Sequence, residues 1–355
     1  MDGSIDSTRK CNGTFSAICT IWNLLVVNSG PLRSPSDRSE SLDALRGLAI
    51  SLVVACHYGG FALGIFGVDL FFVLSGFLIG GILLDSRDQL GYFSSFYGRR
   101  AFRILPLYWL LLLITRPYHW HYYLLFMQQL AWLQFGYTYD AGADVTWSLA
   151  NEEQFYLMLP LLIAYLPRRW LVRLLWCGVL LAPVYRWTCA AHLPGHSWRL
   201  FLMPASMDEL FGGVLLACYL RGYCRSPTLW AVLACVVPLY DVAYVVAFGS
   251  SAIPLSVVAL ICCAAVWSST AANVPVLLYP LIWMGRRCYA LYLFHRIALD
   301  VSLDLGLDRY AAVLAFLAVC VFAEISWLLI EAPLIGYARR RFVRAGTAAV
   351  ATAAA

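Results

Sequence analysis

Charged residues are scarce in this sequence, and their scarcity excludes most classes of soluble protein. Asp, Glu, Lys and Arg make up 13% of the 355 residues, whereas soluble domains carry about 25%. Apolar residues reach 62%, and the mean hydropathy of +0.73 is too high for a surface in contact with water. Apolar stretches long enough to cross a bilayer, roughly 20 residues each, recur along the chain. The composition predicts one integral membrane domain and no soluble second domain.

Motifs for metal and nucleotide chemistry are also missing. The 12 cysteines are scattered, with no C-x-x-C pair and no zinc-ligand spacing. The chain has no Walker A loop, no G-x-S-x-G elbow and no H-E-x-x-H motif. The net charge is +5, but the basic residues lie in short loops between apolar stretches and form no stripe. We therefore expect no metal centre and no nucleic-acid partner.

The loop charges predict how the chain crosses the membrane. Apolar spans are expected at about 42–66, 67–84, 104–115, 147–166, 174–191, 204–220, 228–248, 252–270, 276–300 and 310–332. If the first span starts in the cytoplasm, the arginine-rich loops fall on the cytoplasmic side, as the positive-inside rule requires. This holds only if the aromatic stretch 118–137 does not cross, so we interpret it as an interfacial or re-entrant helix on the outer side. The sequence thus predicts an all-α polytopic membrane helix bundle of about ten transmembrane helices, with both termini cytoplasmic.

Both ends of the chain are expected to lie outside this bundle. Residues 1–40 are interpreted as an N-terminal extension, either disordered or the result of a start codon assigned too early. A signal peptide is a further alternative, although no A-x-A-like cleavage site is evident. Residues 41–342 are expected to form the transmembrane domain, and the Ala-rich segment 343–355 a disordered tail.

Arg46 and His57 are the first candidates for chemistry inside the membrane. They lie eleven residues apart in one expected helix, so they share a face and are separated by a rise of about 16 Å. Arg46 then lies near the cytoplasmic surface and His57 near mid-membrane, which suits a substrate with an anionic head and a long arm. A guanidinium can hold phosphates, and an imidazole can move a proton at the reactive end. A boundary arginine and a structural histidine would explain the same pair without catalysis.

Two adjacent acids, Glu152 and Glu153, open the span that begins at Trp147. Ionisable residues in a span are costly, and these two cannot both face lipid. Tyr156 lies one turn from Glu152 on the same helix face. Either glutamate could orient an imidazole or protonate a leaving group. The alternative is a water-exposed helix start, where acidic residues favour the helix dipole.

His295 and Asp69 are further polar residues in apolar surroundings. His295 follows a pair of tyrosines at 289 and 292, and it could serve the reaction or form a structural interhelical hydrogen bond. Asp69 is the one chemical hint in the segment 67–81, whose small residues otherwise predict close helix packing.

The last expected span carries Glu324 and Glu331, which are seven residues apart and share a face. Pro333 is expected to end this helix just past Glu331. For Glu331, a structural salt bridge to a loop arginine competes with a catalytic role.

Together these segments resemble the acyltransferase family 3 membrane proteins, which include O-antigen and exopolysaccharide acetylases and some macrolide acylases. The resemblance covers about residues 42–341 and rests on five motifs in the family's order. They are Leu42-Asp-Ala-Leu-Arg-Gly-Leu-Ala with His57 after it, Gly67-Val-Asp-Leu-Phe-Phe-Val-Leu-Ser-Gly-Phe-Leu-Ile, Phe96-Tyr-Gly-Arg-Arg-Ala-Phe-Arg-Ile-Leu-Pro-Leu-Tyr-Trp, Thr146-Trp-Ser-Leu-Ala-Asn-Glu-Glu-Gln-Phe-Tyr, and the C-terminal segments Gly285–His295 and Glu331-Ala-Pro.

The resemblance implies a multi-pass O-acyltransferase of the bacterial inner (plasma) membrane. Such an enzyme moves an acyl group, acetyl on family grounds, from acyl-CoA to a hydroxyl of a cell-surface glycan or related saccharide. The implied partners are acyl-CoA (acetyl-CoA), a carbohydrate or glycolipid acceptor and membrane lipid, and no metal is implied. The alternative class is a transporter or flippase of a lipid-linked saccharide, which would not consume acyl-CoA.

The resemblance also implies roles for individual residues. Arg46, Arg99 and Arg103 would hold the phosphates of the donor. His57 would act as the general base or carry the acyl group transiently, and Glu152 would orient or polarise His57 from the outer side. The polar residues assigned to substrate binding or to structure are Asp69, Tyr156, His295 and Glu331.

Overall fold

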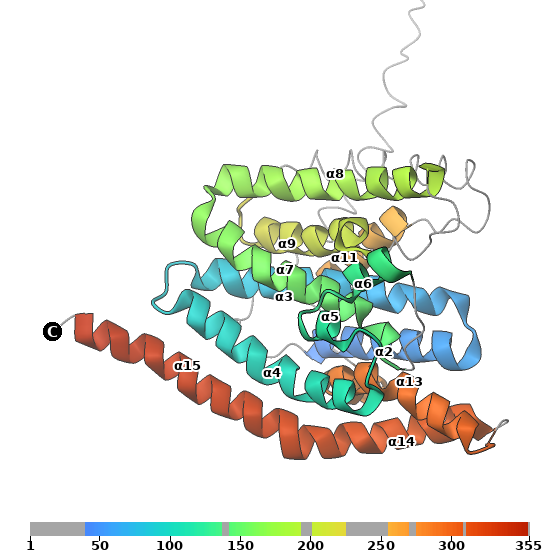
Figure 1. Cartoon of the computed structure of the whole chain (residues 1–355). Helices are drawn as coiled ribbons and strands as arrows, with labels where there is room; N and C mark the ends of the chain where they lie inside the picture. The colour runs from blue at the N-terminus through green and yellow to red at the C-terminus, as the bar shows by residue number, and fades with distance from the viewer. Residues whose placement is uncertain are drawn as a thin grey trace, which may run out of the picture.

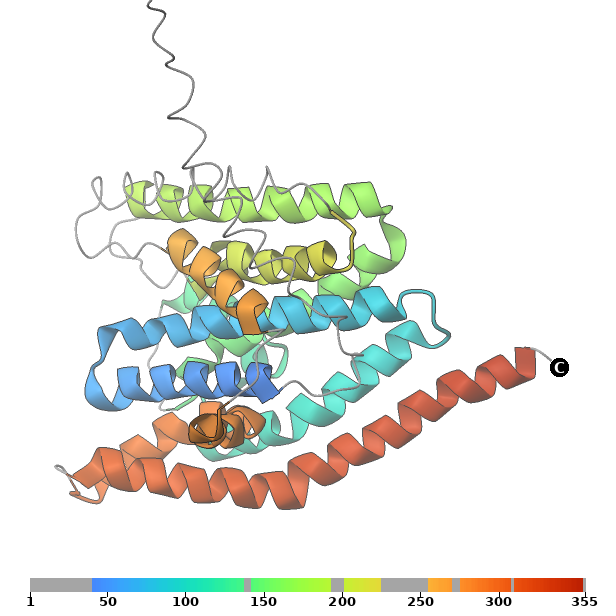
Figure 2. The ribbon, with the colours of Figure 1, turned by 180° about the vertical axis from the view of Figure 1, so that it is seen from behind.

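The computed structural model describes residues 40–136, 142–192, 201–224, 255–269, 275–307 and 310–353, and every regular element in these ranges is helical. Long helices are stacked from α8 (Arg168–His192) through α9 (Met207–Leu220), α3 (Phe66–Ser86) and α2 (Glu40–Gly59) to α14 (Ala311–Ser326) (Figure 1). Figure 2 shows the same order from behind. The prediction of an all-α helix bundle is confirmed.

The remaining helices fill the bundle or cross it obliquely. They are α4 (Tyr92–Thr115), α5 (Trp120–Leu124), α6 (Gln128–Phe135), α7 (Trp147–Tyr165), α11 (Leu255–Ser269), α12 (Tyr279–Arg286), α13 (Cys288–Asp304) and α15 (Ala332–Ala353). In both views α15 continues α14 after a bend and runs along α4 (Figures 1 and 2).

Four helices in the described ranges are long and apolar enough to cross a membrane, which agrees with the predicted membrane character. They are Glu40–Gly59, Ala62–Ser86, Arg168–His192 and Ala311–Phe342. The stretch 118–137 contains α5 and α6, of 5 and 8 residues, each too short to span a bilayer. The ten-helix topology and the cytoplasmic termini stay predictions, and the expected span 228–248 lies outside the described residues, as do residues 1–39.

Two expected segment boundaries are wrong near the arginine motif and at the break before His295. Residues 99–103 lie on a helix and not in a loop, because α4 begins directly after Gly91, which adopts φ 75°. The span expected at 276–300 is divided into α12 and α13 at Arg287, whose φ of −112° and ψ of 10° are not helical. This break lets α12 pack against α2 while the Arg287 side chain reaches Glu324 on α14.

Pro333 does not end the last helix, contrary to expectation. A π-helical turn at Trp327–Glu331 connects α14 to α15, and Pro333 is the second residue of α15. In the first turn of a helix a missing N–H costs little, and the wide π-turn accommodates the proline ring.

Glycines hold α2 and α3 close to their neighbours. A β-carbon on Gly76 would collide with the backbone of Leu210 in α9, and one on Gly47 would collide with the backbone of Leu281 in α12. Lipid acyl chains are as apolar as the helices, so the hydrophobic effect does not drive helices together in a bilayer. Helices in lipid associate instead through close van der Waals packing of this kind. The close packing predicted from the small residues of segment 67–81 is confirmed, and it fixes the two helices that form walls of the site.

Candidate functional site

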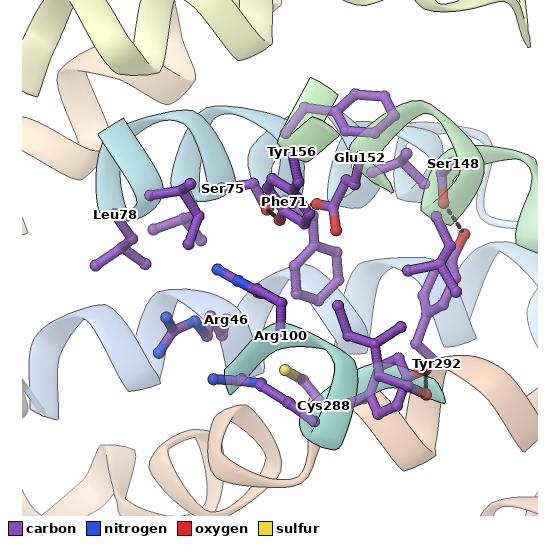
Figure 3. A pocket seen from close by; sticks show the side chains of 18 residues that line it. Arg46, Phe71, Ser75, Leu78, Arg100, Ser148, Glu152, Tyr156, Cys288 and Tyr292 are labelled. Carbon is purple, nitrogen blue, oxygen red and sulfur yellow. Dashed lines mark hydrogen bonds between the residues drawn. The ribbon is translucent and has the colours of Figure 1, made fainter. Parts of the chain in front are cut away.

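A cavity of about 120 Å³ lies between α2, α3, α4, α7 and α13 (Figure 3). Its lining residues on α3 extend from Val68 to Ile79, a rise of about 16 Å along the helix. A small volume spread over this length makes a narrow channel. Arg46 and Leu78 lie toward one end, and Ser148 and Tyr292 lie at the other (Figure 3). The shape fits an extended, unbranched chain.

Three arginines line this cavity. Arg46 donates to Oδ1 of the fully buried Asp43 at 2.8 Å. Arg100 and Arg103 also line it, and no carboxylate in the described part of the chain forms an ion pair with either. Guanidinium groups that face a cavity without a carboxylate partner favour binding of an anion such as a phosphate.

Arg99 was expected in this phosphate site, but the structure places it elsewhere. On an α-helix Arg99 and Arg100 point about 100° apart, and Arg103 lies between them in direction, about one turn from each. Nε of Arg99 donates to the backbone oxygen of Ser95 at 2.9 Å, and the side chain does not line the cavity. Arg100 occupies the position expected for Arg99. This difference was not foreseen because residues 99–103 were interpreted as a loop, in which helical spacing does not apply.

Glu152 lies at the middle of the cavity wall in a chain of hydroxyl groups (Figure 3). The hydroxyl of Tyr156 donates to Ser75 at 2.9 Å, and the hydroxyl of Ser75 donates to Glu152. The guanidinium of Arg100 lies over the Tyr156 ring, 4.5 Å from its centre. Both hydroxyl protons are thus directed toward the carboxylate, which ends the chain as an acceptor. Glu153 does not line the cavity, and one of its buried oxygens has no partner in the described residues.

His57 and His295 form a pair beyond the far end of the cavity. Nε2 of His295 lies 3.2 Å from Nδ1 of His57, and the ring centres are 4.9 Å apart. Nδ1 of His57 also lies 3.0 Å from the backbone oxygen of Val53, and Nδ1 of His295 lies 2.7 Å from that of Tyr292. His295 is completely buried.

These contacts fix the protons on both imidazole rings. A backbone carbonyl can only accept, so Nδ1 of each histidine carries a hydrogen. The lone pair of His295 Nε2 therefore faces the Nδ1–H of His57, which is shared with Val53. Nε2 of His57 is left with a lone pair and no partner in the described part of the chain. The arrangement leaves Nε2 of His57 as a free acceptor in the described residues, while Val53 and His295 hold its Nδ1–H.

Tyr292 separates the cavity from the histidine pair. Its ring lines the cavity, and the ring centre lies 5.9 Å from that of His295. Its hydroxyl donates to the backbone oxygen of Val145 at 2.8 Å, so the Ser148 hydroxyl, 2.6 Å away, is the donor to Tyr292. The two hydrogen bonds fix this ring at the end of the channel (Figure 3).

The structure does not bring Glu152 to His57. Glu152 accepts from Ser75, whereas the ring partner of His57 is His295. Asp69 also lies away from the cavity, beside a buried ion pair in which Arg186 donates to Asp208 at 2.6 and 2.9 Å.

Glu331 likewise lies outside the cavity. It is buried and accepts from the hydroxyl of Ser326 at 3.1 Å. The salt bridge considered for Glu331 is instead formed by Glu324, which accepts from Arg287 at 2.8 Å and from the indole of Trp283 at 2.9 Å. Among the described residues, no group of three or more His, Cys, Asp or Glu side chains is placed to hold a metal ion.

Some cavity residues had no role in the sequence interpretation. They are Ser75, Arg100, Ser148, Cys288, Tyr289 and Tyr292. The spacing of Phe71, Ser75 and Leu78 along one face of α3 was a usable signal, because it places a hydroxyl on the wall that Arg46 faces from α2. The small residue Ser75 was attributed to helix packing, which Gly76 provides.

The sequence profile of the family described as "Acyltransferase domain" matches residues 39–332, which include every residue that lines the cavity and the histidine pair. The chain belongs to this family.

Three relatives are named as O-acetyltransferases or as a membrane-bound transacylase. Peptidoglycan O-acetyltransferase OatA of Listeria monocytogenes is 26% identical over 350 residues, 83% of this chain and 55% of the relative. A protein of Staphylococcus aureus strain COL named as an O-acetyltransferase is 25% identical over 347 residues, 82% of this chain and 56% of that one. A Komagataeibacter xylinus protein named as membrane-bound transacylase BcsY is 32% identical over 154 residues, 38% of this chain and 39% of that one.

The chain spans about half the length of the first two of these relatives. No solved structure matches the chain.

Proposed function

We propose that this acyltransferase moves an acetyl group from acetyl-CoA, bound from the cytoplasmic side of the bacterial inner membrane, to a hydroxyl of a cell-surface saccharide. The observation that carries the proposal is a narrow cavity with Arg100 and Arg103 on its wall and a histidine pair beyond its far end. A donor with an anionic head and a long thioester arm matches this arrangement, with its charge at the arginines and its thioester toward the histidines. Two of the relatives are named as O-acetyltransferases, and the name of one gives peptidoglycan as the acceptor.

The cavity residues would hold the donor by charge and by hydrogen bonds. Arg100 and Arg103, which have no carboxylate partner within the described ranges, supply guanidinium groups for phosphate oxygens, and Arg46, held by Asp43, adds a third positive charge. Glu152 faces the channel as an acceptor, so it suits the amide N–H groups of the pantetheine arm. Its role in this proposal is to position the arm and not to orient His57.

His57 would carry the proton during transfer. Nε2 of His57 takes the proton of the acceptor hydroxyl while its oxygen attacks the thioester carbonyl carbon. The C–O bond forms, the C–S bond breaks, and the thiolate of coenzyme A receives the proton from the His57 imidazolium. The products are the ester and free coenzyme A, with no net gain or loss of protons. The lone pair of His295 Nε2 stabilises the imidazolium through Nδ1–H.

The Tyr292 ring would have to rotate in each cycle. It separates the channel from the histidine pair, so the thioester and His57 meet only when the hydrogen bonds to Ser148 and Val145 are released. With the ring in place, water from the outer side is kept from the thioester.

The experiment is acetyl transfer by purified protein in proteoliposomes, with radiolabelled acetyl-CoA and a mixed glycan extract. His57→Ala should lower transfer by about 10²- to 10⁴-fold, the usual contribution of a general base, while insertion and thermal stability are kept. His192→Ala is the matched control, because this histidine is exposed at the end of α8 and bonds only Thr188 in the described chain. Full transfer by His57→Ala would contradict the assignment, and saccharide movement without release of coenzyme A would support the transporter class instead.

A further inference from the structure

The nucleotide part of the donor needs a binding surface that the cavity does not provide. A channel of about 120 Å³ has room for an extended arm but not for an adenine nucleotide with its phosphates as well. The nucleotide must therefore lie outside the channel, next to its arginine-lined walls. Arg103 marks this direction, because it lines the cavity and lies one helical turn from Arg99 on α4.

The neighbour of α4 at this point is the C-terminal helix α15. Phe102 of α4 contacts Tyr337 and Phe342 of α15, with ring centres 5.3 and 6.2 Å apart. A β-carbon on Gly98 would collide with the Phe342 ring, so the two helices approach closely. Both views show α15 lying along α4 (Figures 1 and 2).

This part of α15 extends beyond the hydrocarbon core. The helix Ala311–Phe342 has 32 residues, which at 1.5 Å each is about 48 Å against a core of about 30 Å. About 12 residues at its end are therefore left for the interfacial and aqueous region. Arg339 belongs to this end and is exposed.

Arg99 and Arg339 are like charges on the two packed helices α4 and α15, close enough for their charges to interact. Burial lowers the pKa of Arg99, and the neighbouring Arg339 lowers it further. Nε of Arg99 bonds Ser95, and neither arginine forms an ion pair with a carboxylate in the described ranges. Two neighbouring guanidinium groups repel unless an anion lies between them. The ring of Tyr337, 48% exposed, lies on the same seam and offers a face on which a base can stack.

We propose that Arg99 and Arg339, on the α4–α15 seam beside Tyr337, bind the phosphate-bearing nucleotide of coenzyme A while the arm enters the channel past Arg103. This inference rests on the proposed function. It gives the helix beyond the matched family segment 39–332 a part in donor recognition. A phosphate of a lipid headgroup has the same chemistry, so the test must separate the two sources.

The test compares two donors that differ only in the nucleotide. The full chain in lipid nanodiscs is assayed with acetyl-CoA and with acetyl-pantetheine, for Arg99→Gln and Arg339→Gln. Each substitution should raise KM for acetyl-CoA about tenfold, as the loss of charge-assisted hydrogen bonds does, and leave KM for acetyl-pantetheine and both kcat values unchanged. Arg173→Gln is the matched control, because this arginine is exposed on α8, at the opposite end of the helix stack from α4 and α15 (Figure 1).

The outcomes distinguish the alternatives. An equal rise in KM for both donors, or no rise for acetyl-CoA, would overturn the nucleotide site and leave the proposed function intact. A difference that appears in phosphatidylglycerol nanodiscs and vanishes in phosphatidylcholine nanodiscs would assign the two arginines to lipid headgroups and overturn it as well. If the unaltered protein uses neither thioester, the proposed function fails and this inference fails with it.

Discussion

His295→Leu tests whether the second histidine controls the first. The change removes the acceptor of the His57 Nδ1–H at 3.2 Å and keeps an apolar side chain in a site that is completely buried. The hydrogen bond from Tyr58 to the backbone oxygen of His295 at 2.6 Å does not involve the side chain and should persist. Nδ1 of His57 then keeps only the carbonyl of Val53.

The expected effect follows from the loss of one hydrogen bond. One hydrogen bond contributes about 0.5–1.5 kcal/mol net, here to the stability of the active His57 tautomer and of its imidazolium. Its loss should therefore lower kcat by about 2- to 13-fold. KM for acetyl-CoA should not change, because His295 does not line the cavity. His295→Gln should recover part of kcat, since its amide oxygen can accept from Nδ1–H as the imidazole does.

The assay is the initial rate of coenzyme A release in proteoliposomes, measured over a range of acetyl-CoA concentrations beside His57→Ala. Thermal unfolding of each variant in detergent separates a positioning effect from a loss of folding. The proposed pair would be refuted if His295→Leu kept the original kcat at equal stability. Equal losses in the leucine and glutamine variants would reduce His295 to a packing role.

Two further predictions concern charge. Arg100→Gln should raise KM for acetyl-CoA tenfold or more, because charge-assisted hydrogen bonds contribute about 1.5–3 kcal/mol. Arg173→Gln is the control, because this arginine lies on the exposed side of α8, and it should leave KM unchanged. An equal rise in KM for both variants would contradict the cavity as the donor site. Asp208→Asn leaves the buried guanidinium of Arg186 without its carboxylate partner, so chemical unfolding should show a loss of about 3–5 kcal/mol. The same change at Asp85, in a partly exposed pair, should cost about 0–1 kcal/mol, and similar losses at both sites would refute the argument from burial.

The sequence predicted which polar residues lie at the site better than it predicted which residues they contact. Arg46, Arg103, Glu152 and Tyr156 were expected at the site, and all four line one cavity. These positions can be predicted because an ionisable residue in an apolar stretch is costly to retain unless something requires it. The same reasoning could not say that Glu152 meets Ser75, because that contact joins residues 77 positions apart on two helices.

The arginine motif shows how one error in local structure changes a site. With residues 92–103 treated as a loop, nothing in the spacing separated the direction of Arg99, which was assigned to the donor phosphates, from that of Arg100, whereas on α4 they point about 100° apart. The error at Pro333 has a similar origin, since a π-turn that accommodates a proline has no signature in composition or hydropathy. Both depend on how a helix packs, which a single segment does not encode.

The sequence by itself determined that this protein is a membrane helix bundle of the acyltransferase family, because hydropathy, loop charge and ordered motifs are local properties of the chain. Tertiary structure alone decided that His57 pairs with His295, that Arg100 and not Arg99 faces the channel, and that α15 lies on α4. The physical reason is that these contacts join segments far apart in sequence. Their positions are set by close packing at glycines such as Gly47 and Gly76 and by backbone breaks such as that at Arg287.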